Sequence, residues 1–185
     1  LEEETGVTDV YMEQLFTYGK VGRDKRMRVI SISHMALIPQ ESIRPIAGDD
    51  AEDVAWFTVE KKEVSDKKHQ IIIRNEELRL CYEYSVDITY KKNGVVSVPI
   101  TDIHANDENR GIAFDHIEMI NAGIDRLRNK VEYVPIAFNL VPEKFTLNEI
   151  QKVYEVILGK KLVKQNFRKW VDKFVEELDE KLPAK

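Results

Sequence analysis

The feature that most constrains the fold is a run of alternating residues near the middle of the chain. From Leu78 to Tyr90, apolar or aromatic side chains occupy every second position, at residues 78, 80, 82, 84, 86, 88 and 90. This alternation places one set of side chains on a single face of a β-strand. Asn93-Gly94 follows, and that pair is the strongest short-range hairpin signal. The middle of the chain is therefore predicted to form an antiparallel meander, with residues 95–103 as the returning strand.

Other strands are predicted on both sides of this segment. Residues 28–38 are β-branched and apolar, and Pro39 ends the run, which indicates a buried strand. Three less regular runs are also predicted as strands, at residues 7–18, 53–59 and 69–74. The charged stretch 61–68 between the last two is predicted as a loop.

A helix is predicted from Asp115 onward. Asp115 and Glu118 have the spacing of a reciprocal N-terminal cap. Apolar residues then recur at helical spacing, at positions 117, 120, 124, 127 and 131. Between this helix and the C-terminal segment lies a short apolar connector bracketed by Pro135 and Pro142, where we expect a domain boundary.

The C-terminal segment has the pattern of two helices joined by a short turn. Thr146 and Glu149 have the spacing of a capping box, and Gly159 ends the first amphipathic run. A second run places apolar residues on one face from Phe167 to Leu178. This pattern fits a helix-turn-helix, and six cations cluster on the turn and second helix against one acid: Lys160, Lys161, Lys164, Arg168, Lys169 and Lys173. The cluster indicates either a DNA-contacting helix or a solvated face.

Composition narrows the class of protein. The chain has 185 residues, 43% of them hydrophobic and 33% charged, as in ordinary soluble domains. No apolar run approaches the roughly 20 residues needed to cross a bilayer, and the single cysteine, Cys81, fits a reducing compartment. We therefore expect a cytoplasmic protein with no membrane partner.

The net charge is +2 from Leu140 onward and −7 before it, which suggests two units with different partners.

The first seven residues, LEEETGV, read as the end of a helix. Glu2, Glu3 and Glu4 are consecutive acids, and Gly6 is suited to the left-handed conformation past a helix end. Acids at a helix C-terminus oppose its dipole, so their use as ligands of a hard divalent cation is one interpretation. A solvated helix end is the other.

Taken together, the chain resembles a Nudix-fold protein with a C-terminal winged-helix domain. That group contains ADP-ribose pyrophosphatases and Nudix-related transcriptional regulators of NAD metabolism. LEEETGV is similar to the end of the Nudix box, G-x5-E-x7-R-E-U-x-E-E-x-G-U with U apolar, in which Glu3 and Glu4 match the paired acids. The resemblance excludes about 61–109 and continues through GRDKRMRVISISHMALIP, IAGDDAEDVAWF, IAFDHIEMI and EYVPIAFNLVPEKFTLNEIQKVYEVILGKKLVKQNFRKW.

The resemblance implies a magnesium (or manganese) site. Carboxylates on one face of the box helix hold the metal against a pyrophosphate, and the metal activates a water for attack. Glu3 and Glu4 would be its ligands and catalytic residues here. The arginine-glutamate pair of the box would precede Leu1. We therefore expect the sequence to be the later part of a longer protein, with an incomplete metal site as given.

Further site residues follow from the same resemblance. Glu118 is expected as a catalytic residue, with Glu118 or His116 acting in proton transfer at the pyrophosphate. Arg23, Arg28 and His116 are expected to bind substrate, since arginine suits phosphate recognition. Arg26 could contact phosphates in the same way or lie in a solvated loop. Asp115 could instead serve only as a helix cap, and the basic loop around Arg23 could simply be solvated.

We interpret the chain as an α/β (α+β) protein. A Nudix-type mixed β-sheet flanked by helices, N-terminally incomplete, is expected over residues 1–132, with a meander extension over about 61–109. A winged-helix domain with an incomplete wing is expected over 133–185. The first expected function is magnesium-dependent hydrolysis of ADP-ribose or a related nucleoside diphosphate derivative. The alternative is a homodimeric DNA-binding regulator that senses ADP-ribose through its Nudix fold.

Overall fold

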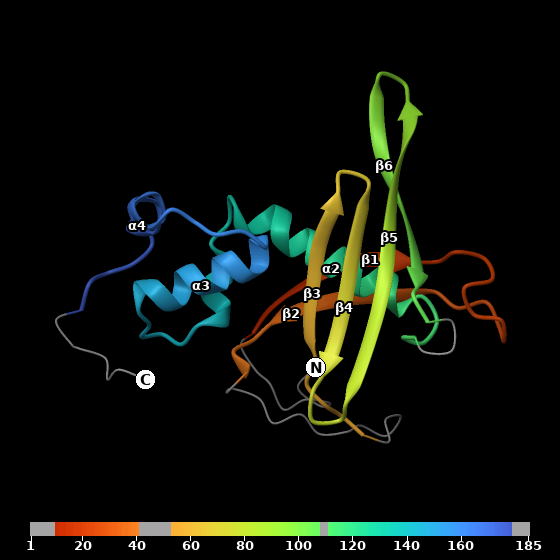
Figure 1. The fold of residues 1–185 in the computed structure, drawn as a ribbon, viewed down its shortest axis with the longest axis horizontal. Helices are drawn as coiled ribbons and strands as arrows, with labels where there is room; N and C mark the ends of the chain where they lie inside the picture. Colours follow the sequence, from red (N-terminus) through yellow and green to blue (C-terminus); the bar gives the residue numbers. More distant parts are fainter. Residues whose placement is uncertain (1–9, 41–52, 108–110, 179–185) are drawn as a thin grey trace. The chain divides into compact units, whose positions relative to one another are not determined.

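The computed structural model describes residues 10–40, 53–107 and 111–178. It is a mixed α+β protein, as predicted, with a two-stranded and a four-stranded sheet (Figure 1). The described elements follow in chain order: β1 Tyr11–Tyr18, β2 Ser31–Leu37, β3 Thr58–Ser65, β4 Lys68–Asn75, β5 Leu80–Asn93, β6 Val96–Ala105, α2 His116–Val131, the 3-10 helix η2 Ile136–Leu140, α3 Leu147–Leu158 and α4 Lys164–Val171.

The described residues form two compact units. One, here called the helical unit, comes from described residues 10–14, 34–40 and 124–178; the other, the sheet unit, comes from described residues 15–33, 53–107 and 111–123. The divisions fall inside β1, β2 and α2, so each of these elements contributes to both units. The domain boundary expected between residues 132 and 133 stays a prediction.

The sheet unit is built on an antiparallel meander in which β3, β4, β5 and β6 lie in sequence order (Figure 1). Ile71 pairs with Tyr84, and His69 pairs with Val86. Since paired residues point to the same face, Ile71, Tyr84 and Val86 share one face, and all are buried with Ile117 of α2. The predicted meander is thus confirmed, and its alternation is explained by one buried face.

The charged stretch 61–68 was predicted wrongly as a loop. Most of it belongs to β3, which pairs with β4 and has Thr58 opposite Arg74. Residues 53–57, predicted as a strand, precede it and are irregular. Charged residues suit an outer strand, because most of their side chains remain in water. Lys61 is the exception: it is 6% exposed, and its ammonium donates to the Asn121 side chain at 2.8 Å.

The hairpin of β5 and β6 continues past the end of β4 (Figure 1). Asn93 pairs with Val96, so the loop residues are Gly94 and Val95, one position later than the predicted Asn93-Gly94 pair. Gly94 has φ +63°, a conformation that glycine adopts without steric cost. Pro99 lies opposite Tyr90 in the ribbon. Several apolar side chains of β6 are exposed: Val96, Val98 and Ile100.

The helical unit has a separate core. Ile150 and Tyr154 of α3 and Phe167 and Val171 of α4 are buried together with Val131. Around Tyr154 the aromatic rings meet edge to face, with centroids 5.3 Å from Phe167 and 5.1 Å from Trp170, a favourable arrangement for aromatic pairs. These contacts orient α4 against α3.

The second C-terminal helix is shorter than predicted. It ends at Val171, so Phe174, Val175 and Leu178 follow the helix instead of continuing its apolar face. Val175 still packs against the core, whereas Phe174 and Leu178 are exposed. An apolar period can continue past the end of a helix, because residues after it can also reach the core.

Among the described residues, no helix is long and apolar enough to cross a membrane.

Candidate nucleic-acid interface and ligand pocket

The helix-turn-helix begins with a complete capping box. Glu149 donates its backbone N–H to the Thr146 hydroxyl at 3.2 Å, and the Glu149 carboxylate accepts the Thr146 N–H at 2.8 Å. At the other end Gly159 adopts φ +67°. A side chain there would also crowd Arg128, whose guanidinium lies 3.2 Å from the position of a Cβ. Both predicted ends of α3 are confirmed.

The turn between α3 and α4 is held by Glu155. Its carboxylate accepts hydrogen bonds from the Lys161 ammonium at 2.8 Å, the Leu162 N–H at 3.0 Å and the Gln151 side chain at 3.1 Å. These bonds, with that from Lys161 the strongest, lower the pKa of Glu155 to about 2. The carboxylate is therefore ionised at neutral pH and fixes the angle at which the chain enters α4.

Helix α4 presents a basic face to solvent. Phe167 and Val171 face the core, so the positions on the opposite side of the helix are exposed. Lys164 and Arg168 are four residues apart and share one exposed face, with Lys169 beside them. The second helix of a helix-turn-helix is the one that enters the major groove, and α4 is placed and charged for that role.

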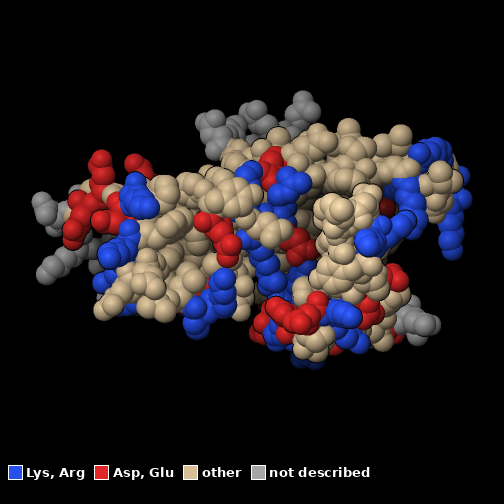
Figure 2. Space-filling view, turned by 90° about the horizontal axis from the view of Figure 1, so that it is seen from above, with Lys and Arg blue, Asp and Glu red and all other residues tan. Residues whose placement is uncertain are grey.

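The six predicted DNA-contacting residues divide into two groups. Lys160 pairs with Glu132 at 3.3 Å, and Lys161 pairs with Glu155. The others form no ion pair with any described residue: Lys164, Arg168, Lys169 and Lys173. On the face shown in Figure 2, basic and acidic side chains are interspersed over much of the surface. The unpaired cations of α4 are thus the best placed to meet phosphates.

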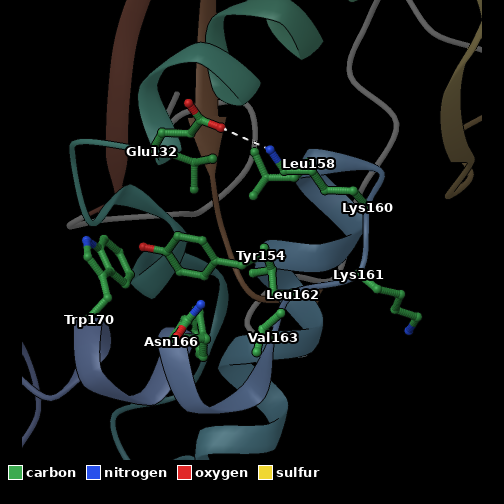
Figure 3. A pocket seen from close by; sticks show the side chains of 11 residues that line it. Glu132, Tyr154, Leu158, Lys160, Lys161, Leu162, Val163, Asn166 and Trp170 are labelled. Atoms are coloured by element: carbon green, nitrogen blue, oxygen red, sulfur yellow. Dashed lines mark hydrogen bonds and ion pairs between the residues drawn. The ribbon is translucent and has the colours of Figure 1, made fainter.

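A pocket of about 460 Å³ lies in the helical unit between α3 and α4 (Figure 3). Tyr154 and Trp170 line it, and the Glu132–Lys160 pair lies at its edge. The Tyr154 hydroxyl points toward Trp170 (Figure 3) and has no hydrogen-bond partner among the described residues. Burial raises the pKa of Tyr154 to about 12, so this hydroxyl stays neutral.

In the sheet unit, Arg23 joins the loop after β1 to the start of α2. Its guanidinium forms a two-pronged pair with Asp115, at 2.7 and 2.6 Å, and also donates to the Ser31 hydroxyl at 2.6 Å. Hydrogen bonding to Arg23 lowers the pKa of Asp115. The Asp115 carboxylate therefore binds Arg23 and does not form the predicted cap with Glu118.

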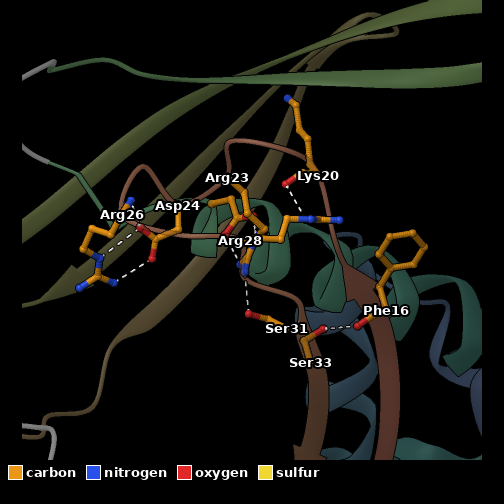
Figure 4. Close-up of polar contacts among 9 residues, drawn as sticks. Phe16, Lys20, Arg23, Asp24, Arg26, Arg28, Ser31 and Ser33 are labelled. Carbon is orange, nitrogen blue, oxygen red and sulfur yellow. Dashed lines mark hydrogen bonds and ion pairs between the residues drawn. The ribbon is translucent and has the colours of Figure 1, made fainter.

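The remaining predicted substrate residues are placed apart. Arg28 is exposed and donates to the Lys20 carbonyl at 3.4 Å (Figure 4). His116 is also exposed, with its ring 6.0 Å from that of Phe114. An open pocket of about 540 Å³ includes Arg23 and Glu118 in its lining. Arg28 and His116 are not part of that lining. Of the four residues predicted in this unit, the structure therefore brings Arg23 and Glu118 together and leaves Arg28 and His116 outside the pocket.

The predicted metal ligands Glu3 and Glu4 lie outside the described residues. Among the residues that the structure does describe, no group of three or more His, Cys, Asp or Glu side chains is arranged to hold a metal ion. The magnesium site and the site roles inferred from the sequence stay predictions.

Sequence reasoning missed one residue of the 540 Å³ pocket and the contact that a second one makes. Phe114 lines it with its backbone at φ +53°, and the Arg26 guanidinium lies 5.3 Å from the centre of the Phe114 ring. A left-handed phenylalanine has no local sequence signal, because this region disfavours bulky side chains. Arg26 is one of the arginines considered from the sequence as phosphate contacts, but its contact with Phe114 has no signal in the sequence.

Residues 137–185 match the family described as the NrtR DNA-binding winged helix domain. The chain is 26% identical over 182 residues to the "ADPR responsive transcriptional repressor NtrR" of Acinetobacter baylyi, covering 97% of this chain and 54% of the relative. It also resembles the crystal structure of Shewanella oneidensis NrtR, with TM-score 0.53 and 25% identity, covering 93% of this chain and 58% of that one.

A second Shewanella oneidensis NrtR structure, complexed with a 27mer DNA, shares the fold with TM-score 0.53 and 23% identity, covering 93% of this chain and 57% of that one. The chain thus spans little more than half the length of the relatives it matches. These likenesses fit the DNA-binding alternative better than the hydrolase expected first.

Proposed function

We propose that this chain, which carries an NrtR-type winged-helix domain and resembles Nudix-related regulators, acts in an ADP-ribose-responsive, DNA-binding transcriptional repressor. The observation that carries the proposal is the helix-turn-helix itself. Its second helix exposes Lys164, Arg168 and Lys169 within a segment that matches a DNA-binding family. A basic second helix in this context meets the phosphates and base edges of the major groove.

The regulator would act as a homodimer in the cytoplasm. Two-fold symmetric operators are read by paired helices, one from each subunit. The proposed response to ADP-ribose is supported by a relative whose name describes such a response. The sheet unit offers a pocket of about 540 Å³, a volume typical of small-molecule sites.

Hydrolysis of ADP-ribose is the less supported function. The family match covers the DNA-binding segment, and the expected metal ligands Glu3 and Glu4 lie outside the described residues. Magnesium at those carboxylates therefore stays a prediction, and no step of the proposed regulation depends on it.

The test is DNA selection followed by titration. The full-length protein is mixed with a random duplex library, and the enriched sequence is used in gel-shift titrations with and without ADP-ribose. We expect an enriched two-fold motif, binding that weakens steeply with salt, and a lower fraction bound when ADP-ribose is added.

Two results would each contradict one part of the proposal, either the DNA binding or the response to ADP-ribose. Absence of salt-sensitive binding to any duplex removes the DNA-binding function. DNA binding that ADP-ribose leaves unchanged removes the response. Release of AMP from ADP-ribose and magnesium in parallel samples, without DNA binding, would favour the hydrolase.

A further inference from the structure

The pocket of the sheet unit combines apolar surface with charged side chains. Ile103 and Ile117 contribute the apolar surface. The charged lining residues are balanced in sign: Arg23, Lys25, Arg26, Asp24, Asp115 and Glu118. Arg23 is paired with Asp115 and Arg26 with Asp24, whereas Lys25 forms no ion pair with any described residue. Apolar surface beside this cation suits a ligand that has both a flat apolar part and an anionic part.

Phe114 is exposed inside this pocket in a costly conformation. Its side chain is 58% exposed, although an aromatic ring of this size gains most from burial. Its φ of +53° is sterically costly for a bulky residue other than glycine. Such a conformation persists only where the surroundings impose it, and it is found mainly at binding and active sites.

The surroundings of Phe114 are fixed on both sides. Asp115, the next residue, is held by the two-pronged pair with Arg23, whose side chain is only 6% exposed. On the other side, the Ile112 N–H donates to the hydroxyl of Tyr84, a buried residue of β5. The ring is therefore presented to the pocket by a rigid frame.

Arg26 covers the Phe114 ring from a mostly exposed position. Its guanidinium lies 5.3 Å from the ring centre, within the range of cation–π attraction. Its partner is Asp24, at 2.8 Å and 3.1 Å (Figure 4), and the Arg26 side chain is 74% exposed. Asp24 binds Arg26 through both carboxylate oxygens and is itself only 10% exposed, so a base that enters beneath Arg26 must tilt this pair away from the ring.

We propose that Phe114 is the stacking platform for the base of the nucleotide ligand and that Arg26 closes over the opposite face of that base. This inference rests on the proposed response to ADP-ribose and assigns its adenine to this pocket. Bases stack on aromatic rings and on arginine guanidinium planes alike. Lys25 lines the same pocket and supplies positive charge for the phosphates.

The experiment is calorimetric titration of the full-length protein with three probes: ADP-ribose, AMP and ribose 5-phosphate. Phe114→Ala should weaken binding of ADP-ribose and AMP by roughly 5- to 100-fold, the range that loss of one stacked base produces. Binding of ribose 5-phosphate, which has no base, should be unchanged. Phe114→Trp should keep the affinity of the natural residue, since it restores a stacking surface.

Phe16→Ala is the matched control, because Phe16 is also an exposed phenylalanine of the sheet unit, at 62%, but does not line the pocket. It should leave all three affinities unchanged. Thermal unfolding of each variant checks that the fold persists.

The outcomes separate this inference from the proposed function. If the natural protein binds ADP-ribose and Phe114→Ala binds it equally well, the stacking role is wrong and the response to ADP-ribose stands. Equal loss of affinity for ribose 5-phosphate also overturns stacking, because the base would not be the group affected. If the natural protein binds none of the probes, the proposed ligand itself is wrong.

Discussion

Glu155 shows how one side chain sets the geometry of the helix-turn-helix. Its carboxylate satisfies the Leu162 N–H in the turn and at the same time binds Lys161. A backbone donor without this partner would have to find water or lose a hydrogen bond. The residue therefore links the sequence of the turn to the direction of α4.

The pH dependence of stability should reveal this carboxylate. Its pKa is lowered from 4.5 to about 2, mainly by the hydrogen bond from Lys161. A lowered folded-state pKa gives stability that is present above the ordinary value and is lost as the pH falls toward the folded-state value. Glu155→Gln should therefore lower the melting temperature at pH 7, and the difference from the natural protein should shrink between about pH 4.5 and 2.

Thermal melts by circular dichroism across that pH range measure the difference. Glu143→Gln is the control, since it removes one exposed negative charge from the same region of the chain. A difference for Glu155→Gln that stays constant down to pH 2 would show that the carboxylate charge is not what stabilises the turn.

At the scale of elements, α4 carries the charges expected to meet DNA. The helix has only eight residues, and its buried face is occupied by Phe167 and Val171. Its exposed cations therefore project from a short helix that is anchored to the core, which gives them fixed positions.

Removing cations from α4 should weaken DNA binding in a salt-dependent way. Arg168→Ala and Lys169→Ala each remove one phosphate-binding charge, so the slope of log affinity against log salt concentration should fall by about 1 for each substitution. Lys92→Ala, in the exposed β5–β6 hairpin, is the matched control and should keep the natural slope. Unchanged slopes for both α4 variants would exclude α4 as the DNA-contacting helix.

Local sequence signals predicted an element correctly where the residues that give the signal also determine the backbone conformation at that place. The capping box of Thr146 and Glu149 and the left-handed Gly159 are such cases, because their effect depends only on neighbours in sequence. The charged strand β3 could not be predicted this way. It exists because its backbone pairs with β4, a partner that local propensity does not reveal.

At the scale of the whole molecule, each unit has its own buried cluster. Ile150 and Val171 lie in the cluster of the helical unit, and Ile71 and Val86 lie in that of the sheet unit. Each unit therefore has its own apolar core, and the stability of each core can be probed by a substitution within it.

Truncating a buried side chain in one cluster should destabilise mainly the elements that pack in that cluster. Ile150 and Ile71 are both fully buried, so Ile150→Ala and Ile71→Ala should each cost about 2–5 kcal/mol. Hydrogen exchange should accelerate in α3 and α4 for the first variant and in β4 and β5 for the second. Val95→Ala, at a residue that is 99% exposed, is the control and should change stability by less than about 0.5 kcal/mol. Identical exchange patterns in the two truncations would contradict separate cores.

The candidate site could be predicted only in part. The sequence pointed to Arg23 and Asp115, and the structure pairs them across 92 positions. It did not indicate that they bind each other, because such a contact depends on the three-dimensional fold. Nor did it reveal the exposed, left-handed Phe114, whose conformation is imposed by neighbours that are distant in sequence.

The β5–β6 hairpin has a consequence for the behaviour of the protein in concentrated solution. Among the described residues, β6 pairs with β5 alone, and its exposed Val96, Val98 and Ile100 are the kind of side chains that promote joining of sheets between molecules. Pro99 lies within this strand, opposite Tyr90, and a proline on an outer strand removes one donor from its open side. The same short segment thus carries both an aggregation hazard and the residue that restrains it.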